Sequence, residues 1–180
     1  MRNSALTAFV LVAIVIFSMD FSYASGRRSR TKDRNLKVGA RVSLYNPPGT
    51  SITTMLFEVT AKYRVSDRFA AEFSAGWTQY NEEGRTTTLI PLQINGEFHP
   101  FGKGVFDPFV GGGVGAYLKK WGDEQSATVG VQALGGFEFR PTTGFSMSLS
   151  VKYILSDITD PRSGGFSFGG GVQGNWETSF

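Results

Sequence analysis

The side chains that could do chemistry in this sequence are charged residues that recur at every second position of several segments. Within each segment, the acidic and basic residues fall on the same alternate positions, and most of the other residues at those positions are Gly, Ser, Thr, Gln or Asn. They could line an ion path, but mutual neutralisation in a closed interior is favoured because an unpaired buried charge is costly. The residues expected to form this interior polar network are Arg41, Glu58, Lys62, Arg64, Glu72, Glu97, Glu138, Arg140 and Lys152.

Other candidate chemistry is sparse. The only histidine, His99, precedes Pro100, and no Ser or carboxylate motif of an acyl-transfer site surrounds it. We therefore interpret His99 as a turn or interfacial residue and expect no catalytic group. With a single histidine and no cysteine, the sequence also predicts no metal site and no cofactor.

The glycine run 111–115 resembles a phosphate-binding loop but lacks the Lys-Ser/Thr ending. A closely packed strand is the better interpretation. Phe109 and Tyr117, on the inward parity of that strand, would then fill the space beside the glycines.

Strict alternation of apolar and polar residues indicates β-strands separated by turn signals such as Asn-Pro-Pro-Gly at 46–49. Pro91 cannot donate to a strand ladder, so we expect a bulge or a strand start near it. The segments expected to form strands are 36–44, 55–64, 69–78, 90–98, 110–118, 127–140, 145–155 and 166–180.

No charged residue falls on the apolar face of any of these segments. A lysine on a lipid-facing surface near the membrane midplane lowers the stability of the barrel by about 2–4 kcal/mol, which explains why charged residues are absent from this face. The polar face is too poor in Lys and Glu to be a water-facing exterior. The sequence therefore predicts an all-β fold, an eight-stranded antiparallel up-and-down transmembrane β-barrel.

Aromatic residues on the apolar face lie near the ends of the segments, as in the interfacial girdles of membrane barrels. A soluble lipid-binding barrel has the same alternation with its apolar face inward, and it remains an alternative. The aromatic residues assigned to one rim are Tyr63, Phe69, Phe98, Phe137, Phe139, Phe145 and Trp176, and those assigned to the other are Trp77, Tyr153 and Phe166.

The chain divides into three parts. Residues 1–24 read as a signal peptide, with Arg2 before an apolar run of 13 residues, which is shorter than the roughly 20 residues of a spanning helix. Residues 25–35 are basic and are expected to be a disordered periplasmic segment. Residues 36–180 form the barrel, with close to balanced charge, so a nucleic-acid partner is not expected.

The chain ends on an alternating segment with Val172, Trp176 and Phe180 on its apolar face. This ending resembles the closing strand of bacterial outer-membrane β-barrels. The segments 91–98 and 107–115 likewise resemble the small outer-membrane barrel superfamily of OmpA-type transmembrane domains, OmpW-like proteins and opacity proteins. The resemblance implies that Phe180, Trp176 and Val172 form the insertion signal.

That resemblance implies a Gram-negative outer-membrane location and, as partners, outer-membrane lipid, the barrel-insertion machinery and periplasmic chaperones. With an even number of strands, both chain ends are expected on the periplasmic side. The opposite loops, 46–54, 81–87, 119–125 and 157–165, are short, which argues against a large adhesive surface.

From these observations we expect a monomeric, non-enzymatic protein that serves envelope integrity or passes small molecules in a porin-like way. A lipid-modifying barrel enzyme and the soluble lipid-binding barrel are the alternatives, because this architecture hosts many functions.

Overall fold

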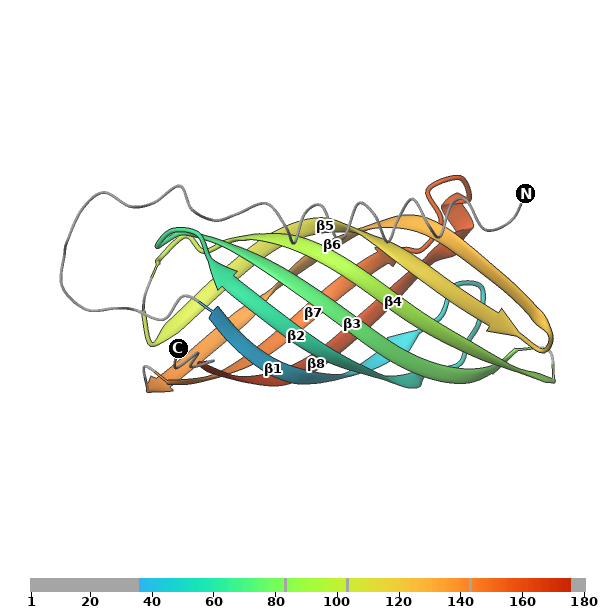
Figure 1. Ribbon diagram of the computed structural model, residues 1–180, viewed down its shortest axis with the longest axis horizontal. Coiled ribbons are helices and arrows are strands. Elements are labelled where there is room, and N and C mark those ends of the chain that lie inside the picture. The colour runs from blue at the N-terminus through green and yellow to red at the C-terminus, as the bar shows by residue number, and fades with distance from the viewer. Residues whose placement is uncertain (1–35, 83, 103, 143, 176–180) are drawn as a thin grey trace, which may run out of the picture. The chain divides into compact units, whose positions relative to one another are not determined.

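A closed β-barrel makes up the described part of the computed structural model, which covers residues 36–82, 84–102, 104–142 and 144–175. Each strand pairs antiparallel with the next along the chain, and the last strand pairs with the first (Figure 1). The predicted fold is confirmed. The elements are β1 Leu36–Asn46, β2 Thr54–Arg64, β3 Phe69–Glu82, β4 Arg85–Phe98, β5 Phe106–Trp121, β6 Glu124–Thr142, β7 Phe145–Leu155, the 3₁₀ helix η1 Pro161–Ser163, and β8 Gly164–Asn175.

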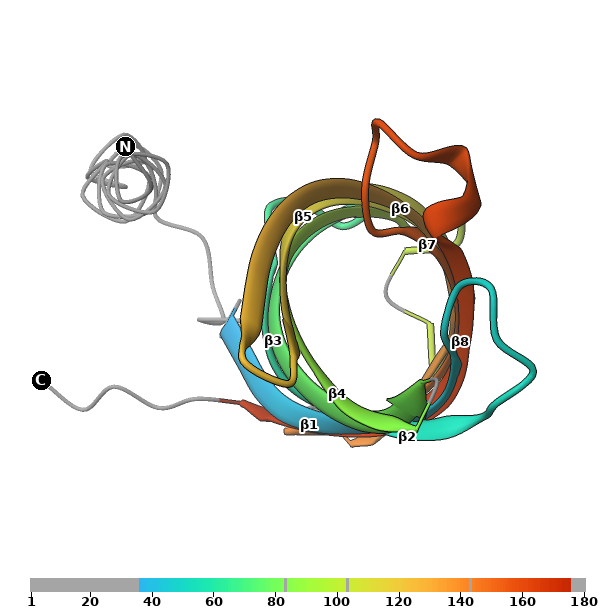
Figure 2. The ribbon, with the colours of Figure 1, turned by 90° about the vertical axis from the view of Figure 1, so that its right-hand side faces the viewer.

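The view along the barrel shows the strands as an unbroken ring (Figure 2). The ring closes between β1 and β8, where Val42 lies opposite Gly170 and Ser43 opposite Gly169. A Cβ atom at Gly169 would overlap the Val42 carbonyl oxygen and the Ser43 hydroxyl. Glycine is therefore needed there for the two strands to approach each other closely.

The two faces of the strands have opposite character, and the apolar face points outward. Val59 is 62% exposed, whereas its neighbours Glu58 and Thr60 are 2% and 1% exposed. Along the middle of the barrel, charged side chains lie in a narrow interior and aliphatic side chains lie outside. This arrangement is favourable only if hydrocarbon surrounds the barrel. This arrangement is the reverse of a soluble lipid-binding barrel, so that alternative is wrong.

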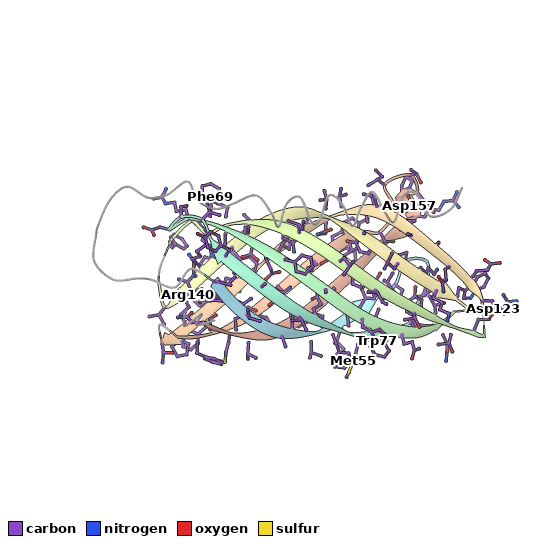
Figure 3. All side chains as sticks on the ribbon, viewed as in Figure 1. Met55, Phe69, Trp77, Asp123, Arg140 and Asp157 are labelled. Carbon is purple, nitrogen blue, oxygen red and sulfur yellow. The ribbon has the colours of Figure 1, made fainter. Side chains whose placement is uncertain are left out.

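The two ends of the barrel differ. We call the end where β1 begins and β8 ends the terminal end, and the opposite end the loop end. Figure 3 shows Phe69 and Arg140 toward the terminal end and Asp123 and Asp157 toward the loop end.

Four strands extend past the predicted segments at the loop end. The predicted loops 81–87 and 119–125 are mostly strand, and each turns at a glycine with positive φ: 77° at Gly84 and 59° at Gly122. The outward residues of these extensions are polar, in contrast to the apolar residues below them. They are Gln79, Asn81, Thr86, Thr88, Lys120 and Gln125. The β3–β4 and β5–β6 hairpins therefore rise beyond the apolar belt.

Outward aromatic rings pack in pairs within the belt. The ring centroids of Phe69 and Phe98 are 5.2 Å apart, and those of Tyr153 and Phe166 are 4.9 Å apart. The other described members of the two predicted rims are also exposed, and Trp176 lies outside the described residues. These pairs place amphipathic and apolar rings on the lipid-facing surface.

The expectation of a bulge or a strand start at Pro91 is wrong. Pro91 lies inside β4, and the pairing of β4 with β3 keeps the same register from Ala75–Leu92 to Thr78–Leu89. The side chain points inward, and a Cβ at Gly76 would lie 3.0 Å from the Pro91 ring. A glycine on the neighbouring strand thus accommodates the proline without a shift of register.

The outward apolar face generates a prediction. Val131→Lys, in the belt, should lower the free energy of unfolding in lipid by about 2–4 kcal/mol because it places a charge in hydrocarbon. Gln125→Lys is the matched control: it lies on the same strand and the same face but outside the belt, and should cost about 0–1 kcal/mol. Urea unfolding in lipid vesicles measures both. Equal stability of the two variants would contradict the lipid-facing assignment.

Candidate functional site in the barrel interior

A network of buried charged side chains fills the interior from its middle to the terminal end. Strand register creates part of it directly, because Arg41 lies opposite Glu58 on β2, and Lys62 lies opposite Glu72 on β3. Opposite charges that face each other across neighbouring strands stabilise the pairing. The network therefore begins with pairs that the ladder itself aligns.

Arg41 makes the most extensive contact of the network. Its Nη2 atom donates to Glu72 Oε2 at 2.9 Å, and both terminal nitrogens donate to Oε1 at 3.2 Å. This two-pronged geometry is the strong form of an arginine–carboxylate pair. Arg41 Nη1 is also 3.6 Å from Glu58 Oε2, so one guanidinium joins carboxylates of two strands.

Lys62 lies between three carboxylates. Its Nζ atom is 2.8 Å from Glu97 Oε2, 3.6 Å from Glu138 Oε2 and 3.8 Å from Glu72 Oε2. The ammonium also lies 5.0 Å from the centre of the Phe109 ring, at cation–π distance. Its side chain is 1% exposed, so its charge is balanced by these carboxylates rather than by water.

Lys152 neutralises the remaining central carboxylate. Its Nζ donates to Glu58 Oε1 at 2.6 Å and to Gln93 Oε1 at 3.1 Å. Gln93 in turn donates to the Tyr117 hydroxyl, which donates to Gln132. The ionic network is thus continuous with neutral hydrogen bonds toward the loop end.

At the terminal end the strand register brings two like charges together. Asp107 on β5 lies opposite Glu138 on β6, an arrangement that is destabilising by itself. Arg140 offsets it by contacting both carboxylates. Arg64 Nη2 also donates to Asp107 Oδ2 at 2.8 Å, and Lys37 Nζ donates to Glu138 Oε1 at 2.9 Å.

His99 is not the partnerless turn residue that the sequence predicts. It follows β4, but its side chain is completely buried. Its Nδ1 lies 2.9 Å from Asp107 Oδ2 and its Nε2 lies 3.2 Å from Glu97 Oε2. Because both ring nitrogens face carboxylates, neither is available to activate a nucleophile.

The structure brings every residue of the predicted network into this single cluster. Sequence reasoning left out Lys37, His99, Asp107, Gln93, Asn95, Gln132 and Tyr117, which also belong to it. The alternation of the strand could have identified Asp107 as an inward residue, because it lies two residues before the inward Phe109. No sequence signal pairs it with His99.

Toward the loop end, the network gives way to an apolar layer. The layer is formed by Tyr45, Leu56, Tyr80, Leu89, Tyr117 and Ile154, each at most 8% exposed. Tyr117 fills space beside glycines as predicted, because a Cβ at Gly115 would lie 3.2 Å from its ring. The interior therefore carries two successive packed layers, one ionic and one apolar.

The remaining sequence expectations concern the insertion signal, the N-terminal segments and metal binding. Val172 is 48% exposed on the outer face of β8. Trp176 and Phe180 lie outside the described residues, as do the proposed signal peptide 1–24 and the basic segment 25–35. In the described part of the chain, no group of three His, Asp or Glu side chains is arranged to hold a metal ion.

No protein-family model matches this chain, and no curated protein sequence matches it. Solved structures do match. Neisserial surface protein A is similar with a TM-score of 0.66 at 13% identity over 78% of this chain and 96% of that one. OprG of Pseudomonas aeruginosa gives 0.52 at 12% identity over 78% and 96%. The outer membrane enzyme PagL gives 0.51 at 13% identity over 78% and 99%.

At 12–13% identity these likenesses concern the fold. Together with the outward apolar belt, they define the class: a small eight-stranded β-barrel of the outer-membrane type. The described barrel matches nearly the whole length of each of these structures.

The buried network generates a prediction. Glu72→Gln leaves Arg41 and Lys62 without their shared carboxylate and should lower the free energy of unfolding by about 3–5 kcal/mol. Asp123→Asn, which removes an exposed carboxylate at the loop end, is the control and should change it by less than about 0.5 kcal/mol. Denaturant titration of the barrel in lipid vesicles measures both. If the Glu72→Gln barrel were as stable as the control, the ion pair between Arg41 and Glu72 would contribute nothing to the free energy of unfolding.

Proposed function

We propose that this protein is a non-enzymatic integral outer-membrane β-barrel with a closed interior that serves envelope integrity. The observation that carries the proposal is that both the ionic layer and the apolar layer of the interior consist of buried side chains. The side chains of Arg41, Lys62 and Lys152 are 1% exposed, and Tyr45, Leu56 and Ile154 above them are equally buried.

This packing favours a structural role over passage of small molecules. An eight-stranded barrel is only just wide enough for side chains to fill. To let a solute through, the barrel would have to break several desolvated ion pairs and displace the apolar layer. The partners that fit such a protein are lipid, the insertion machinery and periplasmic chaperones during assembly, with the terminal end on the periplasmic side and a monomer as the final state.

A conductance measurement tests the closed interior. The full chain refolded into planar lipid bilayers should give no discrete current steps, because buried side chains of the described residues fill both layers. Heat-dependent gel mobility of the same sample serves as the control for a folded, inserted barrel. Steady current steps whose ion selectivity changes in Lys62→Met would contradict the proposal and favour passage.

The enzyme alternative meets a specific obstacle. PagL shows that an enzyme exists on this fold, but the described part of this chain has one histidine, and both of its nitrogens face carboxylates. His99 also lies at the terminal end, whereas we expect a lipid-modifying site on such a barrel near the opposite, outer rim. The geometry supports a structural histidine.

Substitution of His99 separates the two roles. His99→Gln should leave the lipid A and phospholipid profiles of expressing cells unchanged while lowering the free energy of unfolding by about 1–3 kcal/mol, because buried carboxylates lose a donor. Mass spectrometry of lipid extracts measures the first effect and denaturant titration the second. Cells without the protein provide the baseline. Loss of a lipid product at unchanged barrel abundance would establish an enzyme.

A further inference from the structure

The loop end of the barrel contains a cavity of about 270 Å³ above the apolar layer. Its floor is formed by Tyr45, Tyr80, Leu89 and Tyr117, which belong to that layer. Because the layer closes the barrel below it, the cavity is blind and opens only toward the loops. It is therefore a pocket rather than the entrance of a channel.

One wall of the pocket is a loop that its own hydrogen bonds hold in place. The β7–β8 connection is fixed to β6 because Ile158 N donates to Val129 O at 3.1 Å and Thr128 Oγ1 donates to Ser156 O at 2.7 Å. Within the loop, Asp157 N donates to Ser163 Oγ at 2.9 Å. A pocket with a pre-ordered wall loses little entropy when it binds a ligand.

The acidic groups of the pocket are engaged by the loop itself. Asp157 Oδ1 accepts from the Thr159 hydroxyl at 2.6 Å and from its backbone N–H at 2.8 Å, and these hydrogen bonds lower the pKa of Asp157. Asp160 Oδ1 accepts from Arg162 N at 3.0 Å and caps η1. These short carboxylates thus stabilise the wall.

The cationic groups that line the pocket are the long side chains of Lys119 and Arg162. Lys119 lies on β5 opposite Ser126 on β6, which also lines the pocket, so β5, β6 and the β7–β8 loop enclose the same space. Long cationic side chains at a pocket mouth are suited to hold a carboxylate by charge-assisted hydrogen bonds.

The floor offers aromatic surface and one hydroxyl. Tyr45 is 1% exposed and lines the pocket. Because a hydroxyl both donates and accepts, a ligand with a polar group at its inner end could form a hydrogen bond with it. The rings of Tyr45, Tyr80 and Tyr117 favour an aromatic body.

We propose that this pocket binds a small aromatic carboxylate, with its ring on the tyrosine floor and its carboxylate at Lys119 and Arg162. The volume lies just below the 300–1,000 Å³ typical of ligand pockets, which limits the ligand to about one ring. The proposal goes beyond a structural role and requires only the inserted barrel with its closed floor.

The test uses the full chain in lipid nanodiscs with 4-hydroxybenzoate as the probe and 4-hydroxybenzamide as its uncharged counterpart. NMR titration should show that 4-hydroxybenzoate shifts resonances of the loop end and leaves those of the terminal end unchanged, and that it binds more tightly than the amide. Lys119→Ala should weaken the binding of 4-hydroxybenzoate by about tenfold, which corresponds to the loss of one charge-assisted hydrogen bond.

Matched variants make the test specific. Lys120→Ala removes the neighbouring, outward lysine, and Tyr153→Phe removes an outward hydroxyl, so neither should change binding. Tyr45→Phe should weaken binding, and Ser126→Trp should abolish it by filling the pocket. No binding by the wild-type chain, equal binding of the amide, or binding that survives Ser126→Trp would overturn the proposal.

Heat-dependent gel mobility keeps this result separate from the proposed function. A chain that does not insert as a folded barrel contradicts the membrane role itself. A chain that inserts and binds no probe overturns only the pocket.

Discussion

The structure depends on the requirement that charged side chains inside a narrow barrel neutralise one another. Hydrocarbon outside excludes charge from the outer face, so charged residues within the membrane-spanning part must point inward. Eight strands leave little room for water there, so an inward charge is desolvated and needs a partner. Arg41 between Glu58 and Glu72, and Lys62 among Glu72, Glu97 and Glu138, show how shared partners meet this requirement.

The same requirement explains two features that look unfavourable in isolation. Asp107 and Glu138 face each other across adjacent strands, and His99 lies buried between two carboxylates. Arg64, Arg140 and Lys37 converge on this group, so the like charges are embedded among cations. A network that crosses most of the barrel in this way ties distant strands together.

We therefore expect function on this fold to depend on the ends of the barrel more than on its middle. Neisserial surface protein A and the enzyme PagL have the same architecture, which shows that the fold alone does not define an activity. In this chain the two ends differ: the terminal end is closed by ion pairs, and the loop end has a tyrosine-floored pocket with an ordered loop as one wall. Differences among such proteins are expected where strands pass into loops.

The sequence by itself determined the number of strands, their alternation and the identity of most inward charges, because a period of two and the cost of charge in lipid are local properties. Only the tertiary structure decided which charges meet. The partners of Lys152 and His99 depend on the stagger of strands around a closed ring, and Glu58 lies 94 positions before Lys152. The extensions of β3 to β6 also escaped prediction, because their polar outer residues resemble loops until the ladder pairs them.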